Sequence, residues 1–304
     1  MSISVDPVEV GLVRSVPSAA RGGKVRHVLF ALTADRTARR ALQEADSFAR
    51  RLGAELHLIR VVPYADPDVQ GPPRHLVQAV RDAQRVLAAA RHTRKLCDRL
   101  LPEPLPSARI CVRLGSLVDQ VAQRASELDA LFIVVPPGTQ LLARMVVDLV
   151  RRSNSSVLVP KGYTSFVRLL AATDLKDPRT PVLEKAAELG RGLDADVIAM
   201  HTLVDEAGRD SAADLEACRE RLGRATRALS GRLEPIVRRA IDPVQGILEQ
   251  ARVHNVGLIV VGTRARSGRL LPSTATQLVR TARRSVLVAS VDLRCGVLSA
   301  SVAT

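Results

Sequence analysis

Short apolar runs alternate with longer amphipathic segments along most of this chain. The runs are continuous stretches of Val, Leu, Ile and Ala, which is typical of parallel strands buried on both faces. In the segment after the first run, Ala41, Ala45, Phe48 and Leu52 recur at helical spacing. Strands that alternate with helices predict βαβ units with right-handed crossovers, and therefore an α/β fold built on open parallel sheets.

The predicted elements follow one order in each half of the chain. In the first half we expect strands at 28–32, 55–62, 108–113, 130–135 and 156–160, and helices at 37–52, 74–101 and 117–126. In the second half we expect strands at 169–173, 196–203, 235–239, 257–261 and 285–290, and helices at 181–193, 212–229, 243–254 and 275–283. Asp242 and Pro243 are typical of a helix start, with Asp as the cap and Pro in the first turn.

Four segments of the first half recur in the second half in the same order. They are residues 25–35, which recur from Val167, then 51–61 as 192–202, 130–136 as 256–262, and 156–160 as 285–289. The later offsets are shorter, so the second copy has lost residues between its second and third blocks. Four matching blocks in one order predict a duplication, with one fold used twice.

The duplication suggests a division of the chain into tandem domains. We predict a first domain at 25–160 and a second at 167–290, joined by a short linker at 161–166. Residues 1–24 show no periodicity and are expected to form an extension, and residues 291–304 are expected to form a tail.

Composition argues against several function classes. Aromatic residues make up 2% of the chain, with no Trp, so base stacking on aromatic platforms is not expected. The net charge of +14 is spread over both halves and is explained by solvated helix faces, without specific nucleic-acid binding. No run of about 18 apolar residues predicts a membrane span. The four cysteines lack C-x-x-C spacing and no signal peptide is recognisable, which favours a reducing cytoplasm.

Catalytic and metal-binding motifs are likewise missing from the sequence. The six histidines show neither H-x-x-x-H nor H-E-x-x-H spacing, and His57 and His201 are expected to be core or sheet-edge residues. No G-x-S-x-G elbow is found, so nucleophilic catalysis has no recognisable start. We therefore predict no metal ligand and no enzyme activity.

The order of the elements and their motifs resembles that of the universal stress proteins. The motifs are R-L-G-A-E-L at 51–56, L-L-A-A-T-D at 169–174, D-P-V-Q-G-I at 242–247, G-L-I-V-V-G at 257–262 and S-V-L-V at 285–288. The resemblance covers nearly the whole chain apart from its ends. It implies two Rossmann-like domains of the adenine-nucleotide alpha-hydrolase-like class, acting in stress-response regulation.

ATP-binding members of that family carry an Asp after the first strand and a glycine loop with a final Gly-Ser or Gly-Thr. Transferred to this chain, the resemblance implies ATP binding in the second domain by Asp174, Gly262, Thr263, Ser273 and Thr274. Asp174 would contact the adenosine end, and Gly262 and Ser273 would lie on the phosphates. A Ser-Thr pair at a helix start offers hydroxyl and amide donors to phosphate.

The loop departs from the family pattern in both copies. Ala265 replaces the second glycine, and Pro272 removes one backbone N–H from the cradle. In the first copy Thr33 replaces the Asp, Pro136-Pro137 replaces the glycine start, and Ala143-Arg144 stands in the Gly-Ser place. Phosphate cradling is therefore not expected in the first copy.

The resemblance also implies how the domains pair. The last strands, at 157–159 and 286–288, look like the family's dimerisation edges, so the two domains are expected to pair with each other within one chain. A further homodimer of such chains is an open alternative. Two rival functions also stay open, a ligand-free scaffold that works through partners and a weak ATP hydrolase.

Overall fold

The computed structural model describes most of the chain. It covers residues 25–33, 37–64, 74–138, 142–162, 166–177, 179–204, 212–263 and 274–290, without the side chains of residues 74–76. Of the predicted site residues, Ser273 lies outside these ranges, as do the proposed extension at 1–24 and the tail at 291–304.

The two halves contain the same series of elements. The first half holds β1 (His27–Leu32), α1 (Ala38–Arg51), β2 (Glu55–Val62), α2 (Arg74–Leu100), the 3₁₀ helix η1 (Ser107–Arg109), β3 (Ile110–Leu114), α3 (Leu117–Glu127), β4 (Phe132–Val134), α4 (Leu142–Ser153) and β5 (Ser156–Val159). The second half holds β6 (Arg168–Thr173), α5 (Pro181–Leu193), β7 (Asp196–Val204), α6 (Ala212–Arg227), β8 (Leu233–Ala240), α7 (Pro243–Val253), β9 (Leu258–Gly262), α8 (Thr274–Thr281) and β10 (Ser285–Ala289). We call these halves the first and second repeats.

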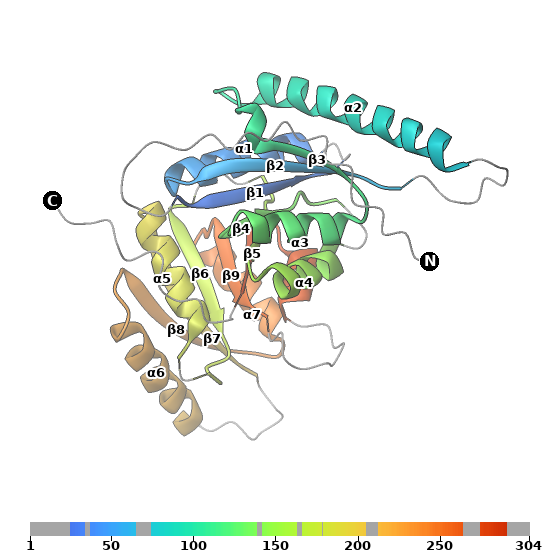
Figure 1. The fold of residues 1–304 in the computed structure, drawn as a ribbon. Coiled ribbons are helices and arrows are strands. Elements are labelled where there is room, and N and C mark those ends of the chain that lie inside the picture. Colours follow the sequence, from blue (N-terminus) through green and yellow to red (C-terminus); the bar gives the residue numbers. More distant parts are fainter. Residues whose placement is uncertain are drawn as a thin grey trace.

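All the described strands belong to one sheet, in the order β3-β2-β1-β4-β5-β10-β9-β6-β7-β8 (Figure 1). Within each repeat every pair is parallel, which confirms the predicted α/β class. The strand order reverses direction between β1 and β4 in the first repeat, and between β6 and β9 in the second. Such switch points are where ligands bind in open parallel sheets.

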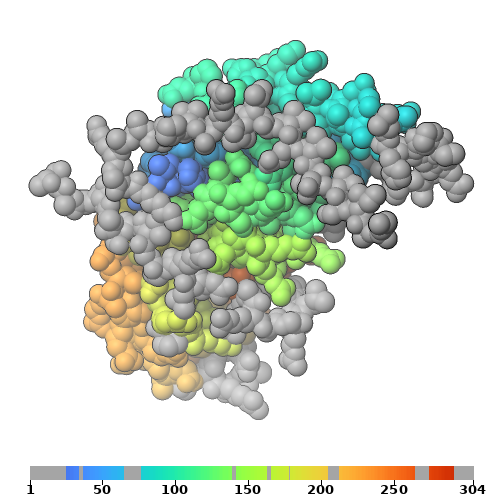
Figure 2. Space-filling view, viewed as in Figure 1, coloured from blue at the N-terminus to red at the C-terminus, as the bar shows by residue number. Residues whose placement is uncertain are grey.

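The repeats join through their last strands. β10 pairs with β5 in antiparallel register, with Leu287 opposite Leu158, so the predicted pairing within the chain is confirmed. The strands of the two repeats therefore run in opposite directions. The carboxyl edge of the second repeat lies on the same side of the sheet as the amino edge of the first. Figure 2 shows the two repeats packed against each other as one body.

Helices cover both faces of the sheet, and alternate strand residues contribute to two cores. One core contains Phe30, Leu158 and Leu287 and is covered by α1, α2, α5 and α6. The other contains Leu29 and Val288 and is covered by α3, α4, α7 and α8. Burial on both faces explains why the strand sequences are continuously apolar.

Several elements differ from the sequence prediction: β3 begins at Ile110 after a 3₁₀ turn, two residues later than expected, and β4 is three residues long where six were expected. α4 was not predicted, although its buried residues recur at helical spacing: Leu142, Met145, Val146, Leu149 and Val150. β8 begins two residues earlier than expected and contains Pro235, which a central strand does not tolerate. β8 is the edge strand of the sheet, where a missing backbone N–H is acceptable. Among the helices that the structure describes, none has the length and apolarity needed to cross a bilayer.

A glycine fixes the distance between α5 and the sheet. A Cβ added at Gly190 would lie 2.6 Å from Val197 Cγ2 and 3.0 Å from the Ala195 carbonyl oxygen. Gly190→Ala is therefore expected to destabilise the protein by about 1–3 kcal/mol through overpacking, measured by chemical denaturation. Gly223→Ala in α6 is the control, because its Cβ would meet only Arg227 Nη2 at 3.9 Å. Helix propensity alone should make that variant more stable by about 0.5–1 kcal/mol. Equal shifts in the two variants would contradict the close packing.

Candidate functional site

The switch point of the second repeat brings three of the predicted residues to one edge of the sheet. β6 and β9 are neighbouring parallel strands, with Ala172 opposite Val261. Continuing this register by two residues places Asp174 level with Thr263, directly after Gly262. The carboxyl ends of the two strands thus bring these residues together, as the sequence predicted for a ligand site.

Two threonine hydroxyls at this edge are buried without a hydrogen-bond partner among the described residues. They are Thr263 Oγ1, on a residue that is 6% exposed, and Thr202 Oγ1 on β7. Met200 and Val261 belong to the core covered by α7 and α8, and the threonines follow them by two residues on the same face. A buried hydroxyl without a partner costs free energy, and a bound ligand would supply the missing partner.

Asp174 is exposed, and its Oδ1 accepts a hydrogen bond from the Lys176 backbone N–H at 3.0 Å. The turn behind it is held by the Arg221 guanidinium, which donates to the Leu175 carbonyl oxygen at 2.6 Å. Asp174 therefore stands at the mouth of the site with its backbone fixed. Thr274 is the first residue of α8, which packs against β9 and β10. Ser273 precedes it outside the described residues, so its place stays a prediction.

The Asp242-Pro243 pair has the predicted structural role. The Asp242 carboxylate accepts hydrogen bonds from the backbone N–H groups of Val244 and Gln245, and Pro243 occupies the first turn of α7. Gly246 in the next turn approaches the edge closely, because a Cβ there would lie 3.3 Å from Thr202 Cγ2. Asp242 therefore orients α7 and does not face a ligand.

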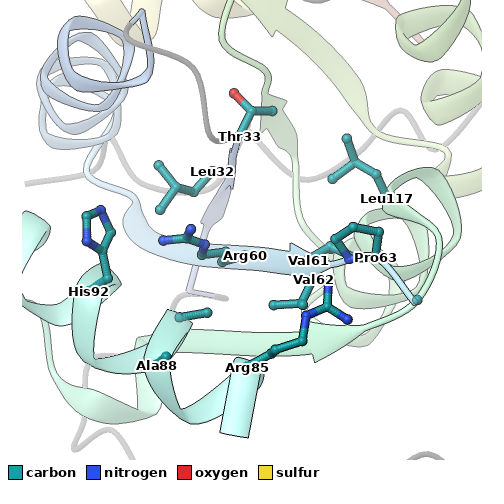
Figure 3. A pocket seen from close by; sticks show the side chains of 12 residues that line it. Leu32, Thr33, Arg60, Val61, Val62, Pro63, Arg85, Ala88, His92 and Leu117 are labelled. Atoms are coloured by element: carbon teal, nitrogen blue, oxygen red, sulfur yellow. The ribbon is translucent and has the colours of Figure 1, made fainter. Parts of the chain in front are cut away.

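The first repeat contains a cavity that the sequence did not predict. It has a volume of about 810 Å³ and lies at the carboxyl ends of β1, β2 and β3, under α2 (Figure 3). Arg60 on β2 faces Arg85 and His92 on α2 across it. Burial lowers the pKa of the Arg60 guanidinium from its usual value. Arg85 is paired with Asp82 at 2.9 Å, so part of its charge is already compensated.

Thr33 lines this cavity, and it corresponds in the first repeat to Asp174 in the second. The Thr33 hydroxyl is buried without a partner among the described residues. A cavity lined by two arginines suits an anionic ligand, but without the carboxylate it does not repeat the second site. The sequence predicted that α2 is longer than the corresponding α6, but it did not indicate which part of the sheet α2 covers. The position of a long helix over a sheet depends on how the side chains of both elements pack together.

The sequence model of the universal stress protein family matches this chain twice, at residues 24–160 and 165–290. The chain belongs to the universal stress protein family. Two consecutive matches make it a tandem universal stress protein, as the motifs predicted, and the continuous sheet is how its two repeats are joined.

Two solved structures that match most of this chain show the same fold. A universal stress protein from Archaeoglobus fulgidus DSM 4304 is 14% identical, covering 86% of this chain and 95% of that one with a TM-score of 0.60. A functionally unknown protein from Pseudomonas aeruginosa PAO1 is 19% identical, covering 87% and 92% with a TM-score of 0.50. A shorter A. fulgidus universal stress protein in complex with dAMP is 25% identical, covering 41% and 97% with a TM-score of 0.34. Comparison with curated protein sequences found no match.

Proposed function

We propose that this universal stress protein acts as a regulatory module that binds ATP at the carboxyl edge of its second repeat and does not turn it over. The observation that carries the proposal is the two buried hydroxyls of Thr202 and Thr263, which lack a partner among the described residues and lie beside the exposed carboxylate of Asp174. A nucleotide supplies donors for the carboxylate and acceptors for the hydroxyls. The site's chemistry therefore fits a sugar phosphate better than an apolar ligand.

Each residue has a role that follows from its chemistry. Asp174 accepts hydrogen bonds from the ribose hydroxyls at the adenosine end, while Thr263 donates its hydroxyl to a phosphate oxygen. Gly262 lets the backbone approach the phosphates, and Ser273 and Thr274 offer hydroxyl and amide donors at the start of α8. Asp242 is engaged in capping α7, and we assign the exposed Asp174 carboxylate to binding the ribose and not to a catalytic step.

The cellular setting is part of the same proposal. Cys97, Cys111 and Cys218 are all free thiols, and burial raises the pKa of Cys97 to about 11, which keeps it unreactive. Free thiols of this kind favour the reducing cytoplasm. There the two repeats form a pseudo-symmetric unit through β5 and β10, and further association of chains would use other surfaces.

Two substitutions test ATP binding at the second repeat. Asp174→Ala and Thr263→Val are each expected to weaken ATP binding at least ~10-fold in calorimetric titration, which corresponds to the loss of about one hydrogen bond. Thr263→Val should leave the free energy of unfolding nearly unchanged, because the hydroxyl has no partner within the described protein. Nucleotide released from freshly purified, denatured protein is the second measurement.

Thr33→Ala is the matched control, because Thr33 holds the equivalent position in the first repeat and should not affect ATP binding. If ATP gives no heat at millimolar concentration, the proposal is wrong and the ligand-free scaffold is favoured. That alternative has a specific basis in Ala265 and Pro272, which depart from the family's phosphate loop. Steady phosphate release that Asp174→Ala removes would instead indicate a weak hydrolase.

A further inference from the structure

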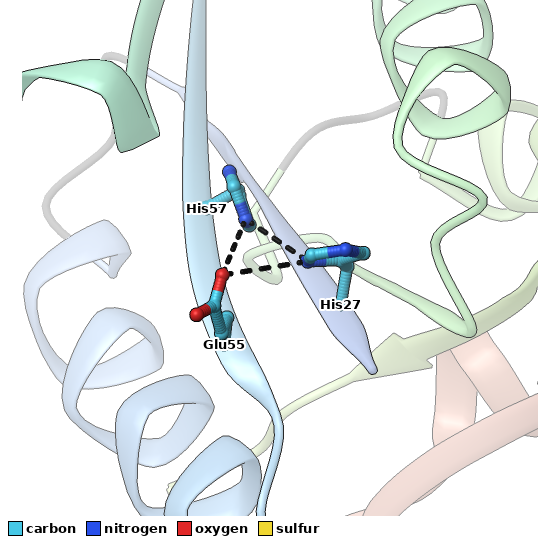
Figure 4. A group of neighbouring side chains, drawn as sticks. All are labelled: His27, Glu55 and His57. Atoms are coloured by element: carbon cyan, nitrogen blue, oxygen red, sulfur yellow. Dashed lines mark hydrogen bonds and ion pairs between the residues drawn. The ribbon is translucent and has the colours of Figure 1, made fainter. Parts of the chain in front are cut away.

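Three side chains that the ATP site does not involve gather at the amino ends of β1 and β2. His27 is the first residue of β1, and Glu55 and His57 are the first and third residues of β2 (Figure 4). The parallel register sets His27 opposite Glu55, and the two-residue repeat of a strand puts His57 on the same face. Residues distant in the sequence thus present two imidazoles and a carboxylate to one point.

The three ligand atoms form a compact triangle. His27 Nδ1 lies 3.1 Å from His57 Nε2, and Glu55 Oε2 lies 3.8 Å from the first and 3.7 Å from the second. A point equidistant from all three lies about 2.1 Å from each, which matches zinc–nitrogen and zinc–oxygen bonds of about 2.0–2.2 Å. The triangle is therefore already the size of one face of a zinc coordination tetrahedron.

Without an ion, His57 Nε2 shares a hydrogen bond with His27 Nδ1, but the other ring nitrogen of this buried residue is left unsatisfied within the described part of the chain. The residue is 7% exposed, its Nε2 points into the triangle, and its Nδ1 has no partner among the described residues. His27 Nδ1 and His57 Nε2 are the ring nitrogens that face Glu55 Oε2, and a neutral imidazole binds a metal through such a nitrogen.

The carboxylate is oriented by a residue outside the triangle. Arg109 donates from Nη2 to Glu55 Oε1 at 2.5 Å, which leaves Oε2 directed at the two imidazoles. Ligating carboxylates are usually held by such a hydrogen bond from a second residue. The side chains of His27 and Glu55 are 22% and 27% exposed, so an ion and a water molecule can reach the open side.

We propose that His27, Glu55 and His57 bind a zinc ion, with a water molecule completing a four-coordinate site. Two imidazoles, one carboxylate and a small triangle suit zinc, whereas magnesium and calcium prefer oxygen ligands in larger numbers. The ion would clamp β1 to β2 and stabilise the first repeat by binding only the folded chain. It would lie on the same edge of the sheet as the ATP site, five strand spacings or about 24 Å away.

The second repeat is an internal control for this site. At the positions that correspond to His27, Glu55 and His57 it has Arg168, Asp196 and Ile198, and Arg168 lies opposite Asp196 in the same register. Arg232 contacts Asp196 at 3.2 Å, as Arg109 contacts Glu55. The Arg–acid pair is present in both repeats, but the imidazoles occur only in the first. We therefore expect one zinc ion per chain.

The test uses the full chain, freed of metal with a chelator and titrated with Zn²⁺ by calorimetry. We expect one zinc ion per chain, a rise in Tm, and the strong visible absorption of four-coordinate Co²⁺ when cobalt replaces zinc. His27→Gln and His57→Gln should each weaken zinc binding at least ~10-fold and remove the cobalt spectrum. The control is His201→Gln, whose partly buried imidazole contacts the Thr173 carbonyl oxygen and should not affect zinc.

Circular dichroism shows whether each variant folds. If His57→Gln fails to fold, His27→Gln alone decides the question, because that side chain is partly exposed. Zinc binding that is absent in the native chain, or unchanged in His27→Gln, would overturn the proposal. A six-coordinate cobalt spectrum would also contradict it. None of these outcomes depends on ATP, so the zinc site and the ATP site succeed or fail separately.

Discussion

Replacing Leu287 with Ala is expected to destabilise the protein by about 2–5 kcal/mol, one of the largest effects of any single substitution in this chain. Leu287 is fully buried in the middle of the sheet, opposite Leu158 on the strand that joins the repeats. The shorter side chain loses the free energy gained by burying the leucine's apolar atoms. It also leaves a cavity in the core, and this cavity cannot collapse because helices pack on both faces of the sheet. Denaturant unfolding measures the change, with Val167→Ala, 59% exposed, as a control expected within about 0.5 kcal/mol.

A double-mutant cycle with Leu158→Ala tests whether the joint is a single packed unit. Because the two leucines face each other, their effects should be non-additive by about 0.5–3 kcal/mol. Additive effects, or a loss below 1 kcal/mol in Leu287→Ala, would mean that the repeats are stable without their shared strands.

The second large effect is expected for Glu44, a carboxylate at the same joint. Glu44 on α1 is fully buried, accepts from the Ser285 hydroxyl at 2.6 Å and accepts from the Gly162 N–H at 2.9 Å. It therefore connects the first repeat, the linker and the last strand. Glu44→Ala removes the acceptor of two donors and should destabilise the protein by about 3 kcal/mol, measured by denaturation. Glu44→Gln, which keeps an acceptor and the shape, should cost less.

The pH dependence of Glu44 has a definite sign. Burial raises the pKa of this carboxyl above its usual 4.5, against the hydrogen bonds from Ser285 and Gly162. A raised pKa in the folded state means that the folded chain holds the proton more tightly than the unfolded chain. This contribution to stability is complete below about pH 4.5 and is lost as the pH rises through the folded pKa. Acidification from neutral pH should therefore stabilise the native chain relative to Glu44→Gln, and the opposite trend would refute the assignment.

The two repeats have diverged into different sites on one scaffold. The second keeps the carboxylate of the nucleotide pattern at its carboxyl edge. The first has a threonine there, a cavity lined by Arg60 and Arg85, and two imidazoles at its amino edge. The antiparallel joint places the proposed zinc and ATP sites on one edge of the sheet, so both would be open to one partner.

Much of the fold follows from local patterns. Continuous apolar runs identified nearly every strand, because strands covered on both faces have no exposed side to carry polar residues. The repeat of four blocks identified the duplication without any structure. α4 was missed although its spacing is helical, and β8 was predicted at 235–239, three residues shorter than it is.

The sequence by itself therefore determined the α/β class, the tandem repeat and the family, since all of these depend on order and spacing along the chain, while the candidate ATP residues stay a prediction from the family resemblance. Only the tertiary structure decided what depends on register and on packing between distant segments. The pairing of β1 with β2 brought His27 to Glu55 and His57, although no local spacing links them. The placement of α2 over β2 formed the first repeat's cavity, and packing buried the Thr202 and Thr263 hydroxyls without a partner among the described residues. Strand register and helix placement minimise the energy of the whole chain, so no local pattern contains them.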